Sequence, residues 1–226
     1  MRNVRVRKLT LTAMLCAIAY AVMAVGRIPV VMFLSYDPKD VIICIGGFLM
    51  GPLAAFVVSA VVSLVEMATV SSTGPIGLVM NIISSCAFAC TASLIYRKKR
   101  SMSGAVAGLA AGCATMTAVM LLWNYLVTPI YMGYPREAVA ALLLPVFLPF
   151  NLLKGGLNFA VTLLLYKPAS VALRRAGLLL SEEREGMQPS AAAVKKPWRP
   201  NAGVLLFALL LLATCILLLL VFKGVI

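Results

Sequence analysis

The chain has 226 residues, of which 62% are hydrophobic and 12% are charged, and its mean hydropathy is +1.02. Soluble domains are about 45–50% apolar, so this composition excludes an ordinary soluble protein and predicts an integral membrane protein. The formal net charge of +13 does not indicate nucleic-acid binding, because the basic residues form short clusters between apolar spans, where charge reports membrane topology.

Apolar stretches recur along the whole chain. A helix needs about 20 apolar residues to cross a bilayer core of about 30 Å. The predicted spans cover residues 9–25, 41–50 continuing into 53–70, 75–96, 104–127, 139–166 and 203–222. The basic start and first apolar run are also compatible with a signal peptide, but we interpret that run as a span. The predicted fold class is an all-α integral membrane protein.

The segment 41–70 contains Gly51-Pro52, where a single helix would kink or two helices would meet, because proline lacks a backbone donor and clashes with the preceding turn. If the two residues form a turn, the basic clusters near the amino terminus, at 97–100 and at 167–175 all lie on one side of the membrane. The positive-inside rule makes that side cytoplasmic. We therefore expect six helices followed by a seventh, with a cytoplasmic amino terminus in the plasma membrane.

Residues 27–40 are too polar and proline-rich at their end for a span, and too apolar in the middle for a free loop. They predict a lid or short hairpin that folds back over the helices from the outer side, as functional surface loops often do. Asp40 at its end suits either the N-cap of the second helix or a ligand contact.

Polar side chains interrupt the span 139–166 at PFNLLKGGLN, residues 149–158. Asn151, Lys154 and Asn158 share one helix face, since they are three and four residues apart. A lysine inside a bilayer costs about 2.5–3.5 kcal/mol on insertion scales, and it therefore indicates a functional site. The alternatives are a lysine that snorkels to the interface or one that pairs with Glu66 of the third helix.

Other polar residues in the spans lie at the same depth. Asn81 and Asn124 belong to the outer parts of their helices, as do Glu66 and the polar face of 149–158. Residues that only hold helices together would be spread over both leaflets. Aromatic residues such as Tyr125 crowd the same level, either as an interfacial belt or as a pocket lining. This convergence predicts a pocket open to the exterior.

Three alanines, Ala13, Ala17 and Ala21, form a smooth strip on the first helix. Small residues four positions apart allow another helix to approach closely. The spacing leaves open whether that helix belongs to the same chain or to a partner subunit.

Enzymatic function is not expected. The sequence has no histidine, no Walker-type phosphate loop and no tight pair of carboxylates for acid–base chemistry. Its six cysteines lie in apolar spans without metal-ligand spacing, so we expect neither a metal nor ATP hydrolysis by this chain.

Five segments together resemble a known family. They are SYDPKD (35–40), GGFLMGPLAA (46–55), GPIGLVMNIISS (74–85), NYLVTPIY (124–131) and PFNLLKG (149–155). In this order they are similar to the riboflavin-binding S component of energy-coupling factor (ECF) vitamin transporters, over residues 5–178. The resemblance implies a six-helix protein that binds riboflavin from outside as its transported substrate, with FMN as a second candidate and no cofactor. It also implies a transmembrane T component that the alanine strip faces, and two cytoplasmic ATPases.

The resemblance further implies that Asn124, Asn151 and Lys154 contact the flavin ring while the 27–40 segment closes over the site. Asn81 and Asp40 are candidates for the ribityl hydroxyls or for framing the pocket, and Tyr125 is a candidate for its aromatic lining.

The chain departs from this family at its end. We expect a six-helix binding domain over 1–178, a polar cytoplasmic linker over 179–202 and an additional transmembrane helix over 203–226, which docks on a partner or acts as an anchor. Two other functions remain open: an S component for a different small vitamin, and a structural membrane subunit in which Lys154 pairs with Glu66.

Overall fold

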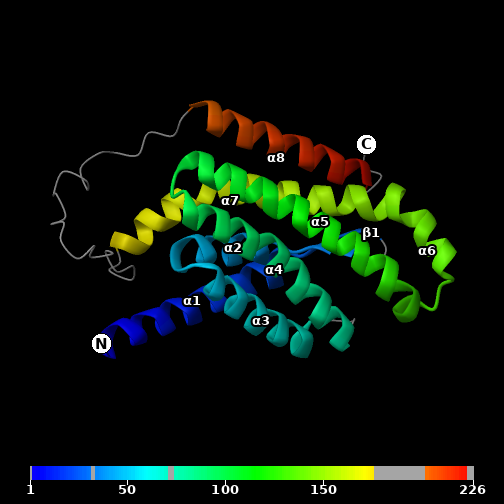
Figure 1. The fold of residues 1–226 in the computed structure, drawn as a ribbon, viewed down its shortest axis with the longest axis horizontal. Helices are drawn as coiled ribbons and strands as arrows, with labels where there is room; N and C mark the ends of the chain where they lie inside the picture. The colour runs from blue at the N-terminus through cyan, green and yellow to red at the C-terminus, as the bar shows by residue number, and fades with distance from the viewer. Residues whose placement is uncertain (1, 32–33, 71–73, 176–201, 223–226) are drawn as a thin grey trace.

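The computed structural model describes residues 2–31, 34–70, 74–175 and 202–222 (Figure 1). In chain order its elements are α1 (Arg2–Gly26), β1 (Ile28–Val31), β2 (Leu34–Tyr36), α2 (Lys39–Met50), α3 (Pro52–Thr69), α4 (Gly74–Lys98), α5 (Met102–Met132), α6 (Arg136–Leu142), the π-helix η1 (Leu143–Phe147), α7 (Leu148–Arg175) and α8 (Ala202–Phe222).

The described helices form the expected bundle of six with a seventh beside it. Long apolar helices able to cross a membrane are α1, α3, α4, α5, the continuous α6–η1–α7 segment and α8. α2 has 12 residues, about 18 Å of helix, which is less than a bilayer core of about 30 Å. It is enclosed by α1, α3, α4 and α7, so it belongs to the bundle without spanning the membrane alone.

The turn predicted at Gly51-Pro52 is confirmed, because α2 and α3 are separate helices. Gly51 has a φ of 98°, which favours glycine over residues that carry a Cβ. Its N–H donates to the carbonyl of Gly47 at 2.8 Å. Pro52 begins α3, where its missing N–H would have no helical partner in any case.

The basic clusters lie together at one end of the bundle. Figure 1 shows that α1 begins, and α4 and α7 end, on the same side. We call this side the basic end; the described residues that define it are Arg5, Arg7, Lys8, Arg97, Lys98, Lys99, Arg100 and Lys167. The opposite side, where β1 and β2 lie, is the hairpin end.

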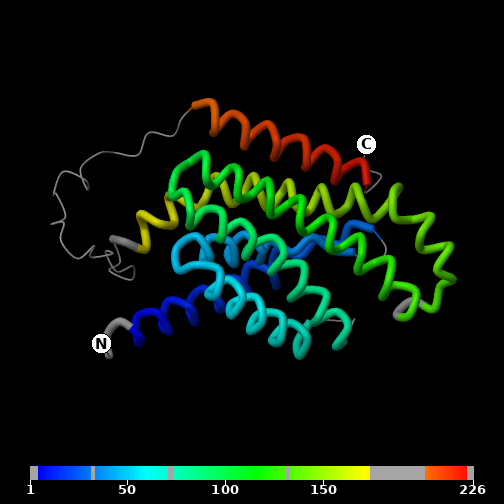
Figure 2. Tube along the Cα trace, in the orientation of Figure 1, coloured from blue at the N-terminus to red at the C-terminus, as the bar shows by residue number. Residues whose placement is uncertain are grey.

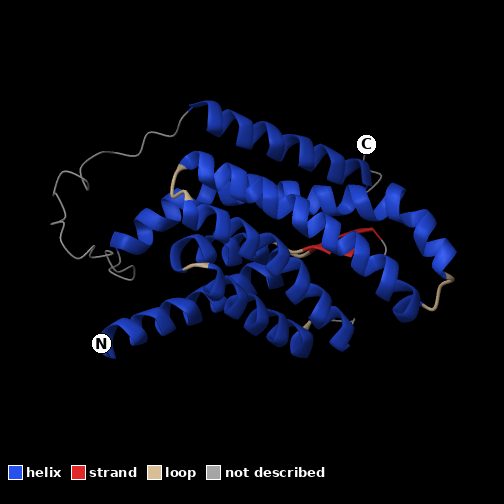
Figure 3. Cartoon of the chain, in the orientation of Figure 1, coloured by secondary structure: helices blue, strands red, loops and turns tan. Residues whose placement is uncertain are grey.

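The segment 27–40 forms the expected hairpin. β1 and β2 pair antiparallel, with Ile28 opposite Tyr36, and they are the strands that Figure 3 shows in red among helices. Leu34 packs with Val139, Phe147 and Phe150. The hairpin is therefore anchored to the start of α7 and to the helix before it.

The last span of the bundle differs from the single regular helix expected over 139–166. It runs from α6 through η1 into α7 and bends on the way (Figure 2). Pro145 lies in η1 and Pro149 follows at the start of α7. Each proline removes a backbone donor and clashes with the preceding turn, and a wider π-turn accommodates this misfit.

α4 and α5 approach each other through glycine. A Cβ added to Gly108 would lie 2.6 Å from the carbonyl oxygen of Ala92, and one added to Gly112 would lie 2.6 Å from that of Phe88. Small residues four positions apart let two membrane helices pack at this short distance. This contact was not predicted from the sequence.

α8 packs along α7 (Figure 2). The rings of Phe159 and Phe207 meet edge to face at 6.0 Å. Cys215 is buried with Tyr36 and Leu153, and a Cβ on Gly156 would lie 2.8 Å from its Sγ. The additional helix is thus seated on the bundle, while most of the linker predicted over 179–202 lies outside the described residues.

Candidate functional site

The polar face predicted on α7 is buried. Asn151, Lys154 and Asn158 are 2%, 6% and 0% exposed. The Nζ of Lys154 lies 3.4 Å from Oδ2 of Asp40 and donates to Oγ of Ser84 at 3.4 Å. The side chain of Asn158 donates to the same Asp40 oxygen at 3.2 Å. α7 is therefore joined through one carboxylate to the first turn of α2.

Glu66 forms a second cluster next to the first. Its Oε1 accepts from the guanidinium of Arg27 at 3.3 Å and from the side-chain amide of Asn81 at 3.1 Å, and its Oε2 accepts from Lys39. The ion pair between Lys154 and Glu66, left open by the sequence, is not formed among the described residues. Lys154 pairs with Asp40 instead.

The formal charges of these two clusters balance. Three cations, Arg27, Lys39 and Lys154, face three carboxylates, Asp37, Asp40 and Glu66. Burying a charge is costly unless it is paired, so this balance is what allows six ionisable groups to lie at one depth. In the loop before α2, burial raises the pKa of the Asp37 carboxyl, although Lys154 and Lys39 act to lower it.

A cavity of about 30 Å³ lies between the hairpin and the helices. Its lining combines ionisable, amide and apolar side chains: Arg27, Leu34, Ser35, Asp37, Met80, Asn81, Ser84, Met120, Phe150, Asn151 and Lys154. Typical small-molecule sites measure about 300–1,000 Å³. A ligand of that size therefore requires the elements that line the cavity to move apart.

Three of the six predicted substrate-binding residues, Lys154, Asn151 and Asn81, line this cavity directly. Asp40 lies behind Lys154 and holds its ammonium group. The N-cap prediction for Asp40 is wrong, because Pro38 occupies that position and Asp40 belongs to the first turn of α2. Its carboxylate accepts from Ser85 instead.

The other two predicted residues, Asn124 and Tyr125, point in different directions. Asn124 is fully buried; its Oδ1 accepts from Thr128 at 3.1 Å, and its Nδ2 has no hydrogen-bond partner among the described residues. This free donor lies one turn from Met120 of the lining. Tyr125 is 37% exposed, and the guanidinium of Arg136 lies 5.6 Å from its ring centre, so the structure does not bring Tyr125 to the cavity.

Four residues of the lining were not predicted from the sequence as site residues: Arg27, Ser84 and the two methionines. Ser84 follows Asn81 by three positions, so the same helical spacing that grouped the α7 residues could have found it. Arg27 appeared only as part of the hairpin segment, and its reach to Glu66 depends on how α3 packs against the end of α1.

The alanine strip lies on the outer surface. Ala13, Ala17 and Ala21 are exposed, whereas the opposite face of α1, including Leu15 and Ala19, is buried. Of the two alternatives for the strip, packing against another helix of this chain is not seen among the described residues, and contact with a partner subunit stays a prediction.

Comparison with known proteins shows the family. The model of the ECF transporter substrate-specific component matches residues 7–166. The chain belongs to this family of S components. It is a multi-pass membrane protein and a substrate-binding part of a transporter. α8 lies beyond the matched residues.

Two curated relatives and one solved structure resemble this S component. The riboflavin transporter FmnP of Bacillus subtilis is 31% identical over 164 residues, which are 67% of this chain and 85% of the relative. The riboflavin transporter RibU of Staphylococcus aureus is 30% identical over 178 residues, 75% of this chain and 93% of the relative. The S component of a bacterial ECF transporter matches with a TM-score of 0.65 and 29% identity, over 77% of this chain and all of that chain. The expected fold is confirmed.

Proposed function

We propose that this S component captures riboflavin at the hairpin end and delivers it for uptake across the cell membrane. The observation that carries the proposal is the buried, charge-balanced cluster around Lys154, which lines a cavity closed by the hairpin. The names of both curated relatives, which are riboflavin transporters, support the choice of ligand. Riboflavin is cargo here, so the chain needs no cofactor.

The chemistry of the lining suits a flavin. An isoalloxazine is planar, apolar in bulk, and carries carbonyl acceptors and an N–H donor on one edge. The ammonium of Lys154 donates to carbonyls, and the carboxamide of Asn151 both donates and accepts. Met80, Met120 and Phe150 supply an apolar cover for the rings. Because the cluster has no formal net charge, it suits a ligand whose ring system is neutral.

The orientation follows from charge. With the basic end in the cytoplasm, as the positive-inside rule favours, the amino terminus is cytoplasmic and the cavity faces outward. The exposed alanine strip of α1 then packs against a transmembrane T component, and two ATPases on the cytoplasmic side supply the energy. This chain contributes binding and no ATP hydrolysis.

Flavin titration tests the proposal. The full chain, purified in mild detergent, is expected to quench riboflavin fluorescence at about one flavin per chain, and FMN is titrated in parallel. Lys154→Ala and Asn151→Ala each remove a donor from the lining, so both are expected to weaken binding at least about tenfold. Lys99→Ala, at the basic end, removes the same charge and is the control.

A protein that leaves riboflavin and FMN fluorescence unchanged overturns riboflavin as the ligand. Binding of a different small vitamin by that same preparation would identify another S component specificity. If no vitamin binds and the Lys154 variants only lose stability, the cluster has a structural role.

A further inference from the structure

One carboxylate oxygen in the lining of the hairpin-end cavity lacks a hydrogen-bond donor. Asp37 directly follows β2, is 3% exposed and lines this cavity. Its Oδ1 accepts no hydrogen bond from any residue that the structure describes. The Nε of Arg27 lies 3.5 Å away, which makes an ion pair but not a hydrogen bond. A buried acceptor of this kind costs free energy until a donor reaches it.

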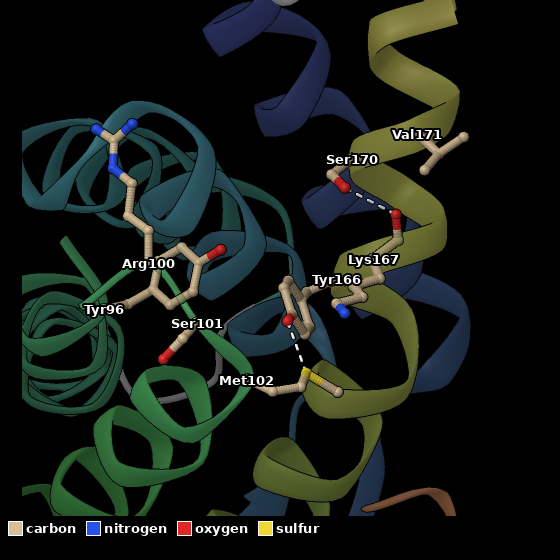
Figure 4. A pocket seen from close by; sticks show the side chains of 8 residues that line it. All are labelled: Tyr96, Arg100, Ser101, Met102, Tyr166, Lys167, Ser170 and Val171. Carbon is tan, nitrogen blue, oxygen red and sulfur yellow. Dashed lines mark hydrogen bonds between the residues drawn. The ribbon is translucent and has the colours of Figure 1, made fainter. Parts of the chain in front are cut away.

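Hydroxyl groups in the larger cavity of the basic end are bonded within the chain instead. This cavity measures about 330 Å³ and lies between the turn from α4 to α5 and the later part of α7 (Figure 4). The hydroxyl of Tyr166 donates to the sulfur of Met102 at 2.8 Å, and that of Ser170 donates to the carbonyl of Lys167 at 2.8 Å. These groups are used inside the fold, whereas Oδ1 of Asp37 still needs a donor.

The three cations near Asp37 already have carboxylate partners. The pairs are Arg27 with Asp37 and Glu66, Lys39 with Glu66, and Lys154 with Asp40. A phosphate group that entered this cavity would find each cation balanced by a carboxylate. Its negative charge would be buried beside Asp37 without a cation of its own, which is unfavourable where the dielectric constant is low.

The donors of riboflavin differ between its ring and its side chain. The N–H of the ring edge lies between the two carbonyls that Lys154 and Asn151 suit, so the carboxamide of Asn151 is its natural acceptor. The remaining donors are the hydroxyls of the ribityl chain. A hydroxyl that donates to a carboxylate makes a charge-assisted hydrogen bond, which is stronger than one between neutral groups.

We propose that Asp37 is a specificity-determining residue, which accepts a hydrogen bond from a ribityl hydroxyl of riboflavin and repels the phosphate of FMN. This role rests on the proposed function and adds to it the choice between the two flavins. A repulsive charge that faces the competitor is a common source of specificity, because it weakens the wrong complex without being needed to strengthen the right one.

Titration of three flavins with the full chain in mild detergent tests this role. Lumiflavin has the ring without the ribityl chain, riboflavin adds the hydroxyls, and FMN adds the phosphate. The unaltered chain is expected to bind riboflavin at least about tenfold more tightly than it binds lumiflavin or FMN.

Asp37→Asn keeps the size of the side chain and removes its charge. Riboflavin is expected to bind about fivefold more weakly to this variant, because a neutral acceptor makes a weaker hydrogen bond. Lumiflavin should stay within about twofold, since it has no ribityl hydroxyl. The preference for riboflavin over FMN is expected to shrink about tenfold or more, because the repulsion of the phosphate is lost as well.

The control is Glu137→Gln. It makes the same change from carboxylate to carboxamide at the hairpin end, on an exposed residue that does not line the cavity. All three affinities are expected within about twofold of the unaltered chain, because solvent and salt screen an exposed charge. An equal loss of preference in Asp37→Asn and Glu137→Gln would assign the effect to the overall charge of this end and overturn the role of Asp37.

Measurements on the unaltered chain keep the test independent of how the variants fold. Equal affinity for riboflavin and lumiflavin, or for riboflavin and FMN, overturns the role of Asp37 and leaves flavin capture intact. An unchanged preference for riboflavin over FMN in an Asp37→Asn protein that still binds lumiflavin overturns it too. If none of the three flavins binds the unaltered chain, the proposed function fails, and the role of Asp37 fails with it.

Discussion

Lys154 and Asp40 depend on each other for their burial. Their charged atoms lie 3.4 Å apart, and the side chains are 7% and 0% exposed. Removing one member of a buried ion pair costs about 3–5 kcal/mol, because the other charge stays buried without a partner. Lys154→Met is therefore expected to lower the stability of the protein without flavin by about that amount, measured by thermal unfolding in detergent.

The double variant Lys154→Met/Asp40→Asn separates the charge effect from lost packing. The carboxamide keeps one oxygen that accepts from Ser85, its NH2 group can donate to Oδ1 of Asn158 once that amide turns over, and no isolated charge remains. It should unfold at a higher temperature than Lys154→Met alone. The single variant Asp40→Asn is measured as well. If the double variant loses as much stability as Lys154→Met and Asp40→Asn lose in sum, the pair does not couple in the way the structure indicates.

Asn124 is expected to lower the stability of the protein without flavin and to strengthen flavin binding. An unpaired buried donor costs about 1–3 kcal/mol, and its Nδ2 has no partner among the described residues. Asn124→Leu is expected to keep or raise stability without flavin while weakening flavin binding about tenfold. Tyr125→Phe, on the exposed neighbour, should change neither. Strong loss of stability in Asn124→Leu with unchanged affinity would assign Asn124 a purely structural role.

The depth and spacing of polar residues in the sequence predicted side chains that line the cavity, but not their pairings. Asn81, Asn151 and Lys154 stood out because amides and an ammonium are rare in apolar spans. The sequence could not predict whether Lys154 forms its ion pair with Asp40 or with Glu66, because the two carboxylates lie at similar depth on different helices. Only the packing of α2 against α7 decides in favour of Asp40. Tyr125, a candidate for the aromatic lining, does not line the cavity; an aromatic residue at this level suits an interfacial belt equally well.

At the scale of elements, the Gly51 turn can be tested directly. Its φ of 98° is a conformation that costs a residue with a Cβ about 1–3 kcal/mol, and open space around the added Cβ leaves strain as the only effect. Gly51→Ala is expected to lower the melting temperature. Gly203→Ala also meets open space, but without a positive φ, and should have no such effect.

α8 packs against the hairpin as well as against α7. Cys215 packs against Tyr36 of β2 and against Leu153, so opening the hairpin disturbs this contact. A chain ending at residue 178 is expected to bind flavin still, because the family match ends at residue 166. Its flavin should dissociate several-fold faster in stopped-flow measurements with excess competitor.

A pair of point variants makes the same test within the full chain. Cys215→Phe places a ring where Gly156 leaves little space and should speed dissociation as the truncation does. Leu217→Phe, at a position 56% exposed on the outer side of α8, should not. Equal rates in the two variants and the unaltered chain would mean that α8 is only an anchor.

Most helices could be predicted from apolar length, and the turn at Gly51-Pro52 from charge placement. The bend through η1 could not, because Pro145 and Pro149 indicate a disturbed helix without saying whether it breaks or widens. The contact of α8 with α7 could not be predicted from the sequence either. A helix that is apolar on all sides carries no stripe that marks a partner, and Gly156 and Cys215 become complementary only when the two helices are side by side.

At the scale of the whole molecule, the proposed ligand site and the proposed partner surface lie on separate parts of the structure. The cavity belongs to the hairpin end, and the alanine strip is exposed on α1. Ala17→Trp puts a bulky side chain where a helix of the T component would need to approach closely. Flavin binding in detergent is expected to remain unchanged, since Ala17 points away from the bundle. Riboflavin uptake by cells that also produce the T component and both ATPases should fall to background.

Ile18→Trp is the matched control for this separation of capture from delivery. Ile18 is 40% exposed on the same helix and lies outside the four-residue repeat of the strip, about 100° around the helix from Ala17, so the same indole added there should leave uptake close to normal. If Ile18→Trp abolishes uptake as fully as Ala17→Trp, then the surface of α1 tolerates no added bulk anywhere, and the strip has no special role. If neither variant affects uptake, the T component contacts another face, and the exposed alanines only meet lipid.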